Sequence, residues 1–186
     1  MTIEFNEVSL HGEGHTLTML AREGRLTCIS GGTAPRRLRW LHVLMGFEPP
    51  ATGYVSVDGE PLVGGCIGHL RKNIAFVPAA LSTVGELVPY EPPTVADVLA
   101  LRSNSRMGVT VSDVEAEACR TGAEGGKALL LALAALRRKA VLVVDSPAPA
   151  SAGYLLDQAR RQGSTVVAAT DDEAVIALAD NIVELT

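Results

Sequence analysis

The sequence predicts an α/β domain built on a mixed β-sheet, antiparallel in its first strands and parallel in its core. Three observations predict this class. The first strand segments follow one another directly, whereas strand and helix segments alternate toward the C-terminus. The segments 141–144 and 166–169 are apolar throughout, which is typical of parallel strands covered on both faces. The length of 186 residues fits a single domain with a hydrophobic core.

The strand segments are short and either rich in β-branched residues or alternating in polarity. They cover residues 3–10, 15–20, 25–30, 54–59, 73–78, 140–145, 164–170 and 181–185. The helical segments cover residues 36–45, 94–101, 111–120, 127–139, 153–163 and 171–179. Ser112 is the expected cap of the helix at 111–120, and the nearly all-apolar helix at 127–139 is expected to be buried. The Pro-rich segment 89–93 is interpreted as a joint between the sheet and a helical excursion.

Charge and cysteine content narrow the function classes. The formal net charge of −5 removes any general attraction to nucleic acid, although it leaves room for a local basic patch. The three cysteines are widely spaced and odd in number, so we expect a reducing, cytoplasmic setting. The first residues lack the features of a signal peptide. The longest apolar run, 128–136, is far shorter than the ~20 residues of a membrane span, so any link to a membrane is expected to go through a partner.

A phosphate-binding loop is indicated by the context of the segment ISGGTAPRRLRWLHVLMGF, which is a strand, a glycine and then a helix. The full motif, G-x-x-x-x-G-K-[ST], turns backbone N–H groups toward phosphates, reaches phosphate oxygens with its lysine and binds magnesium with its hydroxyl. With Gly31 at the first glycine, the second glycine becomes Arg36, the lysine becomes Arg37 and the hydroxyl residue becomes Leu38. By itself, this motif is weak support for nucleotide binding.

Three arginines in the first turn of this helix need an explanation. Arg36, Arg37 and Arg39 place positive charge where the helix dipole is also positive, at a cost of ~0.3–1 kcal/mol each when exposed. Two interpretations remain open from the sequence. Either a bound anion compensates the arginines, or their long side chains extend into water and nothing is bound.

The order of further motifs resembles the ATP-binding cassette (ABC) ATPase domain over residues 3–185. The matching segments resemble, in order, the loop after the P-loop helix (44–62), the strand entering the Q-loop (74–80), the helix beyond it (94–101), Walker B with the D-loop (139–152), and the switch strand with the closing helix and strand (163–185). The resemblance implies a P-loop NTPase-like ABC cassette over 1–186. It implies an α/β core at 1–80 and 138–186 and a shortened helical subdomain at 81–137.

The residues at the family's hydrolytic positions differ from the pattern. The resemblance places Ala79 at the Q-loop glutamine, Ser146 at the glutamate that polarises the attacking water, and Asp171 at the switch histidine. Ser146 carries no charge, and Asp171 would repel a γ-phosphate. Because phosphoryl transfer depends on positioned charge, losing lysine, hydroxyl, glutamine, glutamate and histidine together points away from hydrolysis.

Other positions keep something of the family pattern. Asp145 stands at the Walker B aspartate and is either a magnesium ligand or a cap of the adjoining loop or helix. His11 is the candidate to stack on adenine, or else an ordinary histidine of a surface loop. Gly125 and Gly126 resemble a remnant of the signature LSGGQ. The nucleotide-binding positions that the resemblance implies are Gly31, Gly32, Thr33, Arg36, Arg37, Leu38, Arg39 and His11.

Three functions remain open from the sequence, and whether the chain is an ATPase stays undecided among them. The first is a degenerate, non-hydrolysing cassette that binds ATP and Mg²⁺ weakly or not at all. It would be a regulatory or structural subunit, paired with another cassette as a homo- or heterodimer or with a transmembrane permease subunit. The second is a divergent but active ATPase in which Arg37 replaces the lysine. The third, a nucleic-acid or anion binder, is disfavoured by the net charge and the few aromatic residues. Its basic residues would be Arg36, Arg37, Arg39, Arg71 and Lys72.

Overall fold

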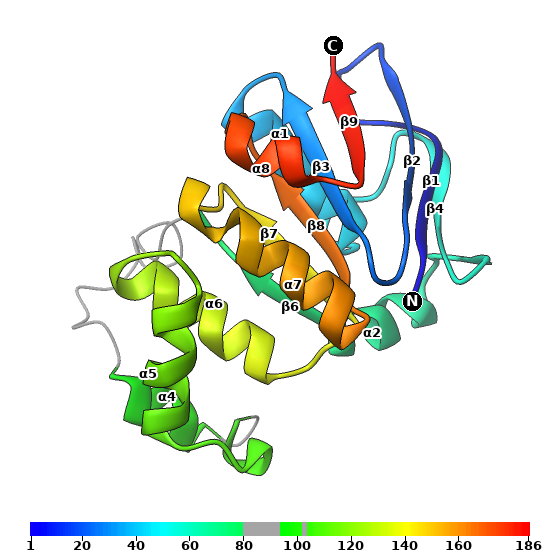
Figure 1. Ribbon diagram of the computed structural model, residues 1–186. Coiled ribbons are helices and arrows are strands. Elements are labelled where there is room, and N and C mark those ends of the chain that lie inside the picture. Colours follow the sequence, from blue (N-terminus) through cyan, green and yellow to red (C-terminus); the bar gives the residue numbers. More distant parts are fainter. Residues whose placement is uncertain (80–93, 102–103) are drawn as a thin grey trace, which may run out of the picture.

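A computed structural model describes residues 1–79, 94–101 and 104–186. The strands of these residues form two sheets, one antiparallel and one parallel. Figure 1 shows the antiparallel sheet on the right, the parallel sheet in the centre and a group of helices extending to the lower left. The predicted α/β class, with antiparallel N-terminal strands and a parallel core, is confirmed.

The antiparallel sheet has the strand order β2–β1–β4–β5. Strand β1 (Ile3–Ser9) pairs on one side with β2 (Thr16–Ala21) and on the other with β4 (Thr52–Val57), and the short β5 (Glu60–Pro61) is added at the edge. Phe5 lies opposite Met19 and Val55 in the register, and all three side chains are buried. One face of this sheet therefore belongs to the core.

The parallel sheet has the strand order β6–β7–β8–β3–β9. Its strands are β3 (Leu26–Gly31), β6 (Ile74–Val77), β7 (Val141–Asp145), β8 (Thr165–Ala169) and β9 (Asn181–Leu185). Every residue of β7 and β8 is buried, as their continuous apolar sequences predict. Since the strands are parallel, their carboxyl ends share one edge, which is where open α/β sheets bind ligands. This edge lies at the upper left of the sheet in Figure 1.

The helices cover both faces of the parallel sheet. Helix α1 (Ala34–Leu44) lies between the two sheets, since Trp40 shares a core cluster with Phe5 of β1 and Val143 of β7. The opposite face is covered by helices α6 (Gly125–Leu136), α7 (Ala152–Gln162) and α8 (Glu173–Leu178), with the short 3₁₀ turn η2 (Pro149–Ser151) before α7. Helices packed on both faces therefore hold the carboxyl edge of the sheet, where the site described below lies.

A second group of helices has a small core of its own. Helices α4 (Val95–Ala100) and α5 (Val111–Arg120), with the 3₁₀ turn η1 (Ser105–Met107) between them, pack on α6 around Val114, Ala132 and Leu133. Thr110 caps α5, and its capping box is completed by Asp113. The expectation that Ser112 caps this helix is wrong, because only the residue three positions before Asp113 can exchange both bonds of a capping box.

The structure also differs from the expected elements where the sequence periodicity is weak. No element was expected between residues 62 and 72, whereas helix α2 (Gly65–Lys72) lies there. Its glycines lower the helix propensity, and only Leu70 is buried, so the apolar periodicity is weak. The interpretation of residues 89–93 as a joint lies outside the described residues. Within the described part of the chain, no helix is both long enough and apolar enough to cross a membrane.

Candidate nucleotide site

The loop between β3 and α1 lies at the carboxyl edge of the parallel sheet. Gly31 and Gly32 have φ angles of 76° and 61°, in the left-handed region that glycine adopts readily. A Cβ atom at Gly31 would lie 2.7 Å from the carbonyl oxygen of Leu185. The Thr33 hydroxyl accepts a hydrogen bond from the backbone N–H of Arg36 at 3.4 Å and caps α1. The turn into the helix therefore explains these residues without a ligand.

Arg37 turns back into this loop and is paired with Asp171. The Arg37 side chain is 6% exposed, and its Nη1 donates to the carbonyl oxygens of Gly31 at 2.9 Å and Gly32 at 3.2 Å. The same Nη1 lies 2.6 Å from Oδ2 of Asp171, and Oδ1 of Asp171 accepts the backbone N–H of Gly31 at 3.1 Å. Asp171 lies between β8 and α8, so the pair closes the loop against the end of the neighbouring strand.

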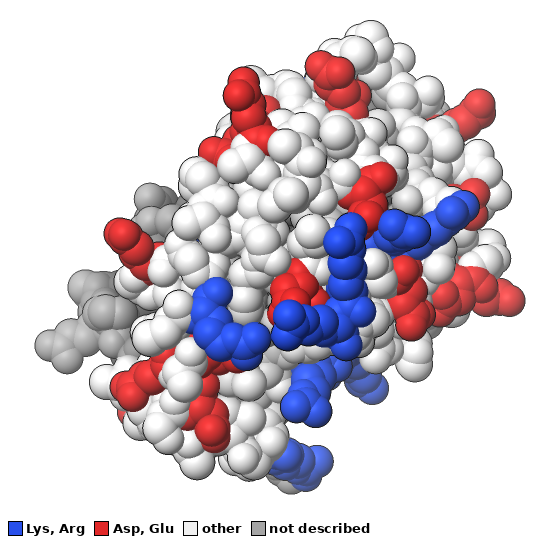
Figure 2. Space-filling view, in the orientation of Figure 1, with Lys and Arg blue, Asp and Glu red and all other residues white. Residues whose placement is uncertain are grey.

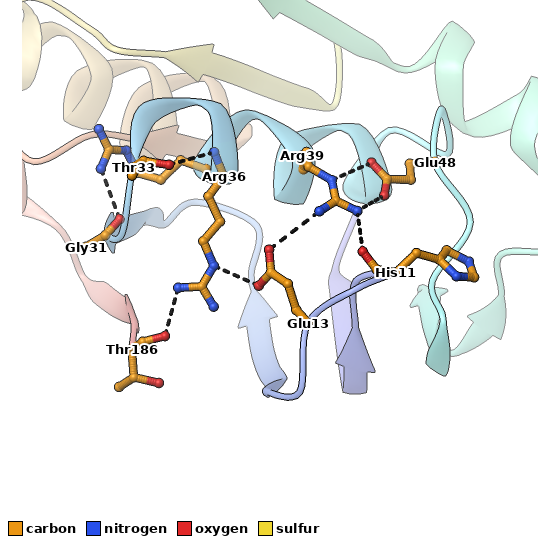
Figure 3. Close-up of polar contacts among 9 residues, drawn as sticks. His11, Glu13, Gly31, Thr33, Arg36, Arg39, Glu48 and Thr186 are labelled. Atoms are coloured by element: carbon orange, nitrogen blue, oxygen red, sulfur yellow. Dashed lines mark hydrogen bonds and ion pairs between the residues drawn. The ribbon is translucent and has the colours of Figure 1, made fainter.

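Glu13, in the loop between β1 and β2, holds the other two arginines, Arg36 in the first turn of α1 and Arg39 in the second. Its carboxylate accepts a hydrogen bond from Nε of Arg36 at 2.7 Å and lies 3.5 Å from Nη1 of Arg39 (Figure 3). Arg36 also donates to the backbone carbonyl of Thr186 at 2.7 Å. The β1–β2 loop and the segment after β9 are thus both attached to the start of α1.

Glu48 holds Arg39 from the other side. One carboxylate oxygen lies 2.5 Å from Nη2 of Arg39, and the same nitrogen donates to the backbone carbonyl of His11 at 3.1 Å. The hydrogen bond from Arg39 is the main cause that holds the pKa of Glu48 below its ordinary value. Figure 3 shows the His11 ring directed away from Arg39 and Glu13, and this residue is exposed. The proposed stacking of His11 on adenine stays a prediction.

The interpretation that the three arginines extend into water is wrong, and compensation by a bound anion stays a prediction. Each of the three side chains pairs with a carboxylate of the chain, from Glu13, Glu48 or Asp171. Glu13 and Glu48 were missed by the sequence analysis. They lie in loops 23 positions before Arg36 and 9 positions after Arg39, where no periodic pattern relates them to the helix.

Glu48→Gln is expected to flatten the acid limb of the stability curve. Because Arg39 lowers the pKa of Glu48 from 4.5 in the folded state, the unfolded chain takes up the proton first as the pH falls. The stabilisation, about 0.5–1 kcal/mol for a partly exposed pair, is present above this ordinary value and is lost as the pH falls through the lowered pKa. Urea unfolding at a series of pH values measures this difference, with Glu60→Gln on the exposed strand β5 as the matched control. A difference that does not change with pH would contradict the assignment.

A second cluster lies where β6 and β7 end. Lys127, in the first turn of α6, donates from Nζ to the backbone carbonyls of Pro78 at 2.8 Å, Ala79 at 3.2 Å and Asp145 at 2.6 Å. Burial lowers the pKa of Lys127, and the charge of Asp145 partly offsets this effect. The three N–H groups of the ammonium thus match three carbonyl acceptors from two strands. This contact ties the start of α6 to the carboxyl edge of the sheet.

Asp145 is buried at the end of β7 beside a residue with an unusual backbone. Its carboxylate accepts a hydrogen bond from the Ser146 hydroxyl at 3.0 Å, and Ser146 has a φ angle of 47°. The following turn η2 has no side-chain cap, so Asp145 does not cap that helical turn. Among the described residues, no group of three or more Asp, Glu, His or Cys side chains could hold a metal ion. A magnesium role for Asp145 stays a prediction.

The structure sorts the sequence-predicted positions into two groups. Gly31, Gly32, Arg37 and Asp171 meet at the β3–α1 loop, as described above. A second group, at the ends of β6 and β7, contains Ala79 and Asp145 and, next to Lys127 at the start of α6, Gly125 and Gly126.

Leu38 stands apart from these groups, because it lies on α1 and presents a hydrocarbon side chain. Lys127 belongs to the second group but was not singled out by the sequence analysis. A lysine that starts a nearly all-apolar helix is the signal that could have found it, because a half-buried ammonium needs acceptors.

Two sheets of this order, with helices on both faces and a separate helical group, define the fold of the ABC ATP-binding cassette. No protein-family model matches the sequence. The structure is similar to cbiO1 from Clostridium perfringens, part of the ABC transporter complex cbiONQ, with a TM-score of 0.71 at 19% identity over 98% of this chain and 83% of that one. The fold predicted from the sequence is thereby confirmed.

Two other solved structures show the same likeness. The dimeric bacterial ABC transporter cassette MJ0796 has a TM-score of 0.68 at 16% identity, over 98% of this chain and 94% of that one. A bacterial Atm1-family ABC exporter with ATP bound has a TM-score of 0.73 at 17% identity, over 99% of this chain and 37% of that one. At these identities the likeness concerns the fold.

Proposed function

We propose that the chain is a degenerate ABC-type cassette that does not hydrolyse ATP and serves as a regulatory or structural subunit of an ABC-type assembly. One observation carries this proposal. The side chains of Arg37 and Asp171 bind the N–H of Gly31 and the carbonyls of Gly31 and Gly32, so the loop that faces phosphates in this fold is closed by the chain itself. A nucleotide would have to displace both side chains.

The residues around this loop argue against a fit to ATP and Mg²⁺. The carboxylate of Asp171 would repel the γ-phosphate at the position from which a donor is needed. Leu38 offers magnesium no oxygen. Nζ of Lys127 donates to the backbone carbonyl of Asp145, so the ammonium would repel a magnesium ion bound beside Asp145. Ser146 has no charge with which to orient water, and we therefore derive no hydrolytic step.

The solved structures of similar fold support the proposal that this chain works as part of a larger assembly. The MJ0796 cassette is dimeric, and cbiO1 is part of a transporter complex. We propose that this chain pairs with another cassette, as a homo- or heterodimer, or with a transmembrane permease subunit on the cytoplasmic side. Its contribution would be a folded surface for the partner.

Titration calorimetry with ATP and Mg²⁺ tests the proposal. We expect no magnesium-dependent binding in the micromolar range for the natural sequence. The triple variant Arg37→Lys, Leu38→Ser, Asp171→His should gain binding, because it returns the phosphate cation, the magnesium hydroxyl and the switch donor. The matched control is Arg36→Lys with Arg39→Lys, which changes the neighbouring arginines of α1 and leaves Arg37, Leu38 and Asp171 as they are. Micromolar, magnesium-dependent affinity of the natural sequence would refute weak or absent binding.

A divergent but active ATPase is the second candidate. It is favoured by the retained Asp145 and by Nε of Arg37, which is buried without a hydrogen-bond partner among the described residues. In this case Arg37 would leave Asp171 and contact a phosphate, and a partner would supply the missing groups. A steady ATPase rate that vanishes in Arg37→Ala and Asp145→Ala would support this candidate. Absence of turnover with any added partner cassette would count against it.

A further inference from the structure

We infer that the amino edge of the parallel sheet is a docking surface for an acidic segment of a partner protein. This edge is opposite the nucleotide site, and the turns at which α6, α7 and β2 lead into β7, β8 and β3 meet there. We call its cations the basic edge; they are Arg22, Arg25, Lys72, Arg138, Lys139, Arg160 and Arg161. Figure 2 shows Lys and Arg side chains that run from the middle of the view to its right, over the end of α7 and beside it, with Asp and Glu side chains next to them.

Few carboxylates neutralise the basic edge. Asp180 is shared by Arg25 at 2.9 Å and Arg160 at 3.6 Å, and Arg161 has a partly buried partner four positions before it in α7, Asp157. No ion pair is found within the described residues for the other four cations, which are Arg22, Lys72, Arg138 and Lys139. Because the whole chain has a net charge of −5, this concentration of positive charge is opposite to the overall charge.

Helix dipoles explain only part of the basic edge. Cations in the last turn of a helix are stabilised by the dipole, and this accounts for Lys72, Arg160 and Arg161 at the ends of α2 and α7. It does not account for Lys139, which follows the helix, or for Arg138. Arg138 has a φ angle of 47°, a left-handed conformation in which glycine or asparagine is the usual residue after a helix. Position 138 thus disfavours arginine for two reasons, its left-handed backbone conformation and the other cations close by.

The basic edge surrounds a cleft. The cleft has a volume of about 640 Å³ and is lined by Arg138, Lys139 and Arg161, together with the polar side chains of Asn73, Gln162 and Ser164. The carboxylate of Glu23 also lines the cleft, and it is paired with the N-terminal ammonium of Met1 at 2.8 Å. A guanidinium binds a carboxylate through two parallel hydrogen bonds, so two arginines and a lysine around one cleft suit several carboxylates of one extended segment. Shape and charge therefore point to the same kind of ligand.

The residues that line the cleft favour an acidic polypeptide as the ligand over a nucleic acid or an anionic membrane. It contains no aromatic residue on which a nucleic-acid base could stack. It has no large exposed aromatic or aliphatic anchor for insertion into a bilayer, and it is concave, whereas a membrane presents a flat layer of headgroups. The inference is independent of whether the nucleotide site binds ATP, because the two sites lie at opposite edges of the sheet.

Fluorescence anisotropy with a labelled oligoglutamate peptide tests the inference at low ionic strength. Arg161→Glu is expected to weaken binding about tenfold, and Arg138→Gly similarly, because each removes a charge-assisted hydrogen-bonding group. Arg106→Glu in the exposed turn η1 is the matched control, since it changes the net charge as Arg161→Glu does but lies away from the cleft. Arg138→Gly should also raise the melting temperature, because glycine relaxes the left-handed backbone. Weaker binding in a more stable protein would not result from misfolding.

Every other outcome counts against the docking surface. Equal weakening in Arg106→Glu and Arg161→Glu would show that only net charge matters. Binding of vesicles made from equal parts of phosphatidylglycerol and phosphatidylcholine, or of oligothymidylate, with no binding of the peptide, would assign the edge to a membrane or to nucleic acid instead. Absence of binding to all three probes would overturn the inference.

Discussion

Asp171→Ala is expected to lower the free energy of unfolding by about 1–3 kcal/mol. The substitution leaves the buried guanidinium of Arg37 facing two carbonyls with no carboxylate. Breaking a buried pair from one side costs ~3–5 kcal/mol, and the 57% exposure of the Asp171 side chain reduces this figure. Chemical denaturation measures the loss. The matched control is Asp157→Ala, which removes a helical pair whose arginine, Arg161, is 76% exposed, and it is expected to cost less than about 0.5 kcal/mol.

Asp171→Ala also tests whether the Asp171 carboxylate is what keeps an external anion out of the β3–α1 loop. Without the carboxylate, the N–H of Gly31 and the guanidinium of Arg37 are free for an external anion. We therefore expect inorganic phosphate to raise the melting temperature of Asp171→Ala and to leave that of the natural sequence unchanged. If phosphate stabilises both proteins equally, or neither of them, Asp171 is not what closes the loop.

Lys127→Met is expected to lower the free energy of unfolding by about 2–4 kcal/mol. The side chain keeps its length but no longer donates to the carbonyls of Pro78, Ala79 and Asp145, which are left with fewer donors at the sheet edge. Amide exchange should also become faster at the carboxyl ends of β6 and β7, since α6 is no longer tied to them. The control is Lys72→Met, an exposed lysine at the end of α2, with an expected change within about 0.5 kcal/mol.

The alkaline limb gives a second measurement on Lys127. Because burial lowers its pKa below 10.5, the unfolded chain binds more protons than the folded one between the lowered value and 10.5. Within that window, the stability of the natural sequence should therefore rise with pH relative to Lys127→Met. A constant difference would show that the Lys127 ammonium is not desolvated in the folded protein, and equal losses for Lys127→Met and Lys72→Met would show that its contacts do not hold the strand ends.

Much of the fold could be predicted because its signals are local. The apolar segments 141–144 and 166–169 lie in fully buried parallel strands, and the alternation of strand and helix gave the order of elements. Helix α2 was missed where glycines made the pattern faint, and the cap of α5 was misplaced by two residues. These errors occur where propensity is weak or where two hydroxyl residues stand close together.

The candidate site was less predictable than the fold. From the sequence, Arg37 could be placed in the loop, and the resemblance to the ABC cassette implied that Asp171 stands at the switch position. Their pairing could not be recognised, because Asp171 is distant in the sequence from the β3–α1 loop and lies 140 positions after Gly31. The same holds for Lys127 and Pro78, which are 49 positions apart.

The sequence by itself determined the class of fold, the approximate elements and the chemical identity of each position in the loop, because periodicity and residue type are properties of short segments. Only the tertiary structure decided that the arginines are neutralised from within, that an ammonium ties α6 to the sheet, and that scattered cations form one edge with a cleft. Those relations depend on which strands become neighbours. The packing of two sheets around α1 sets these positions, and no local pattern encodes the resulting distances.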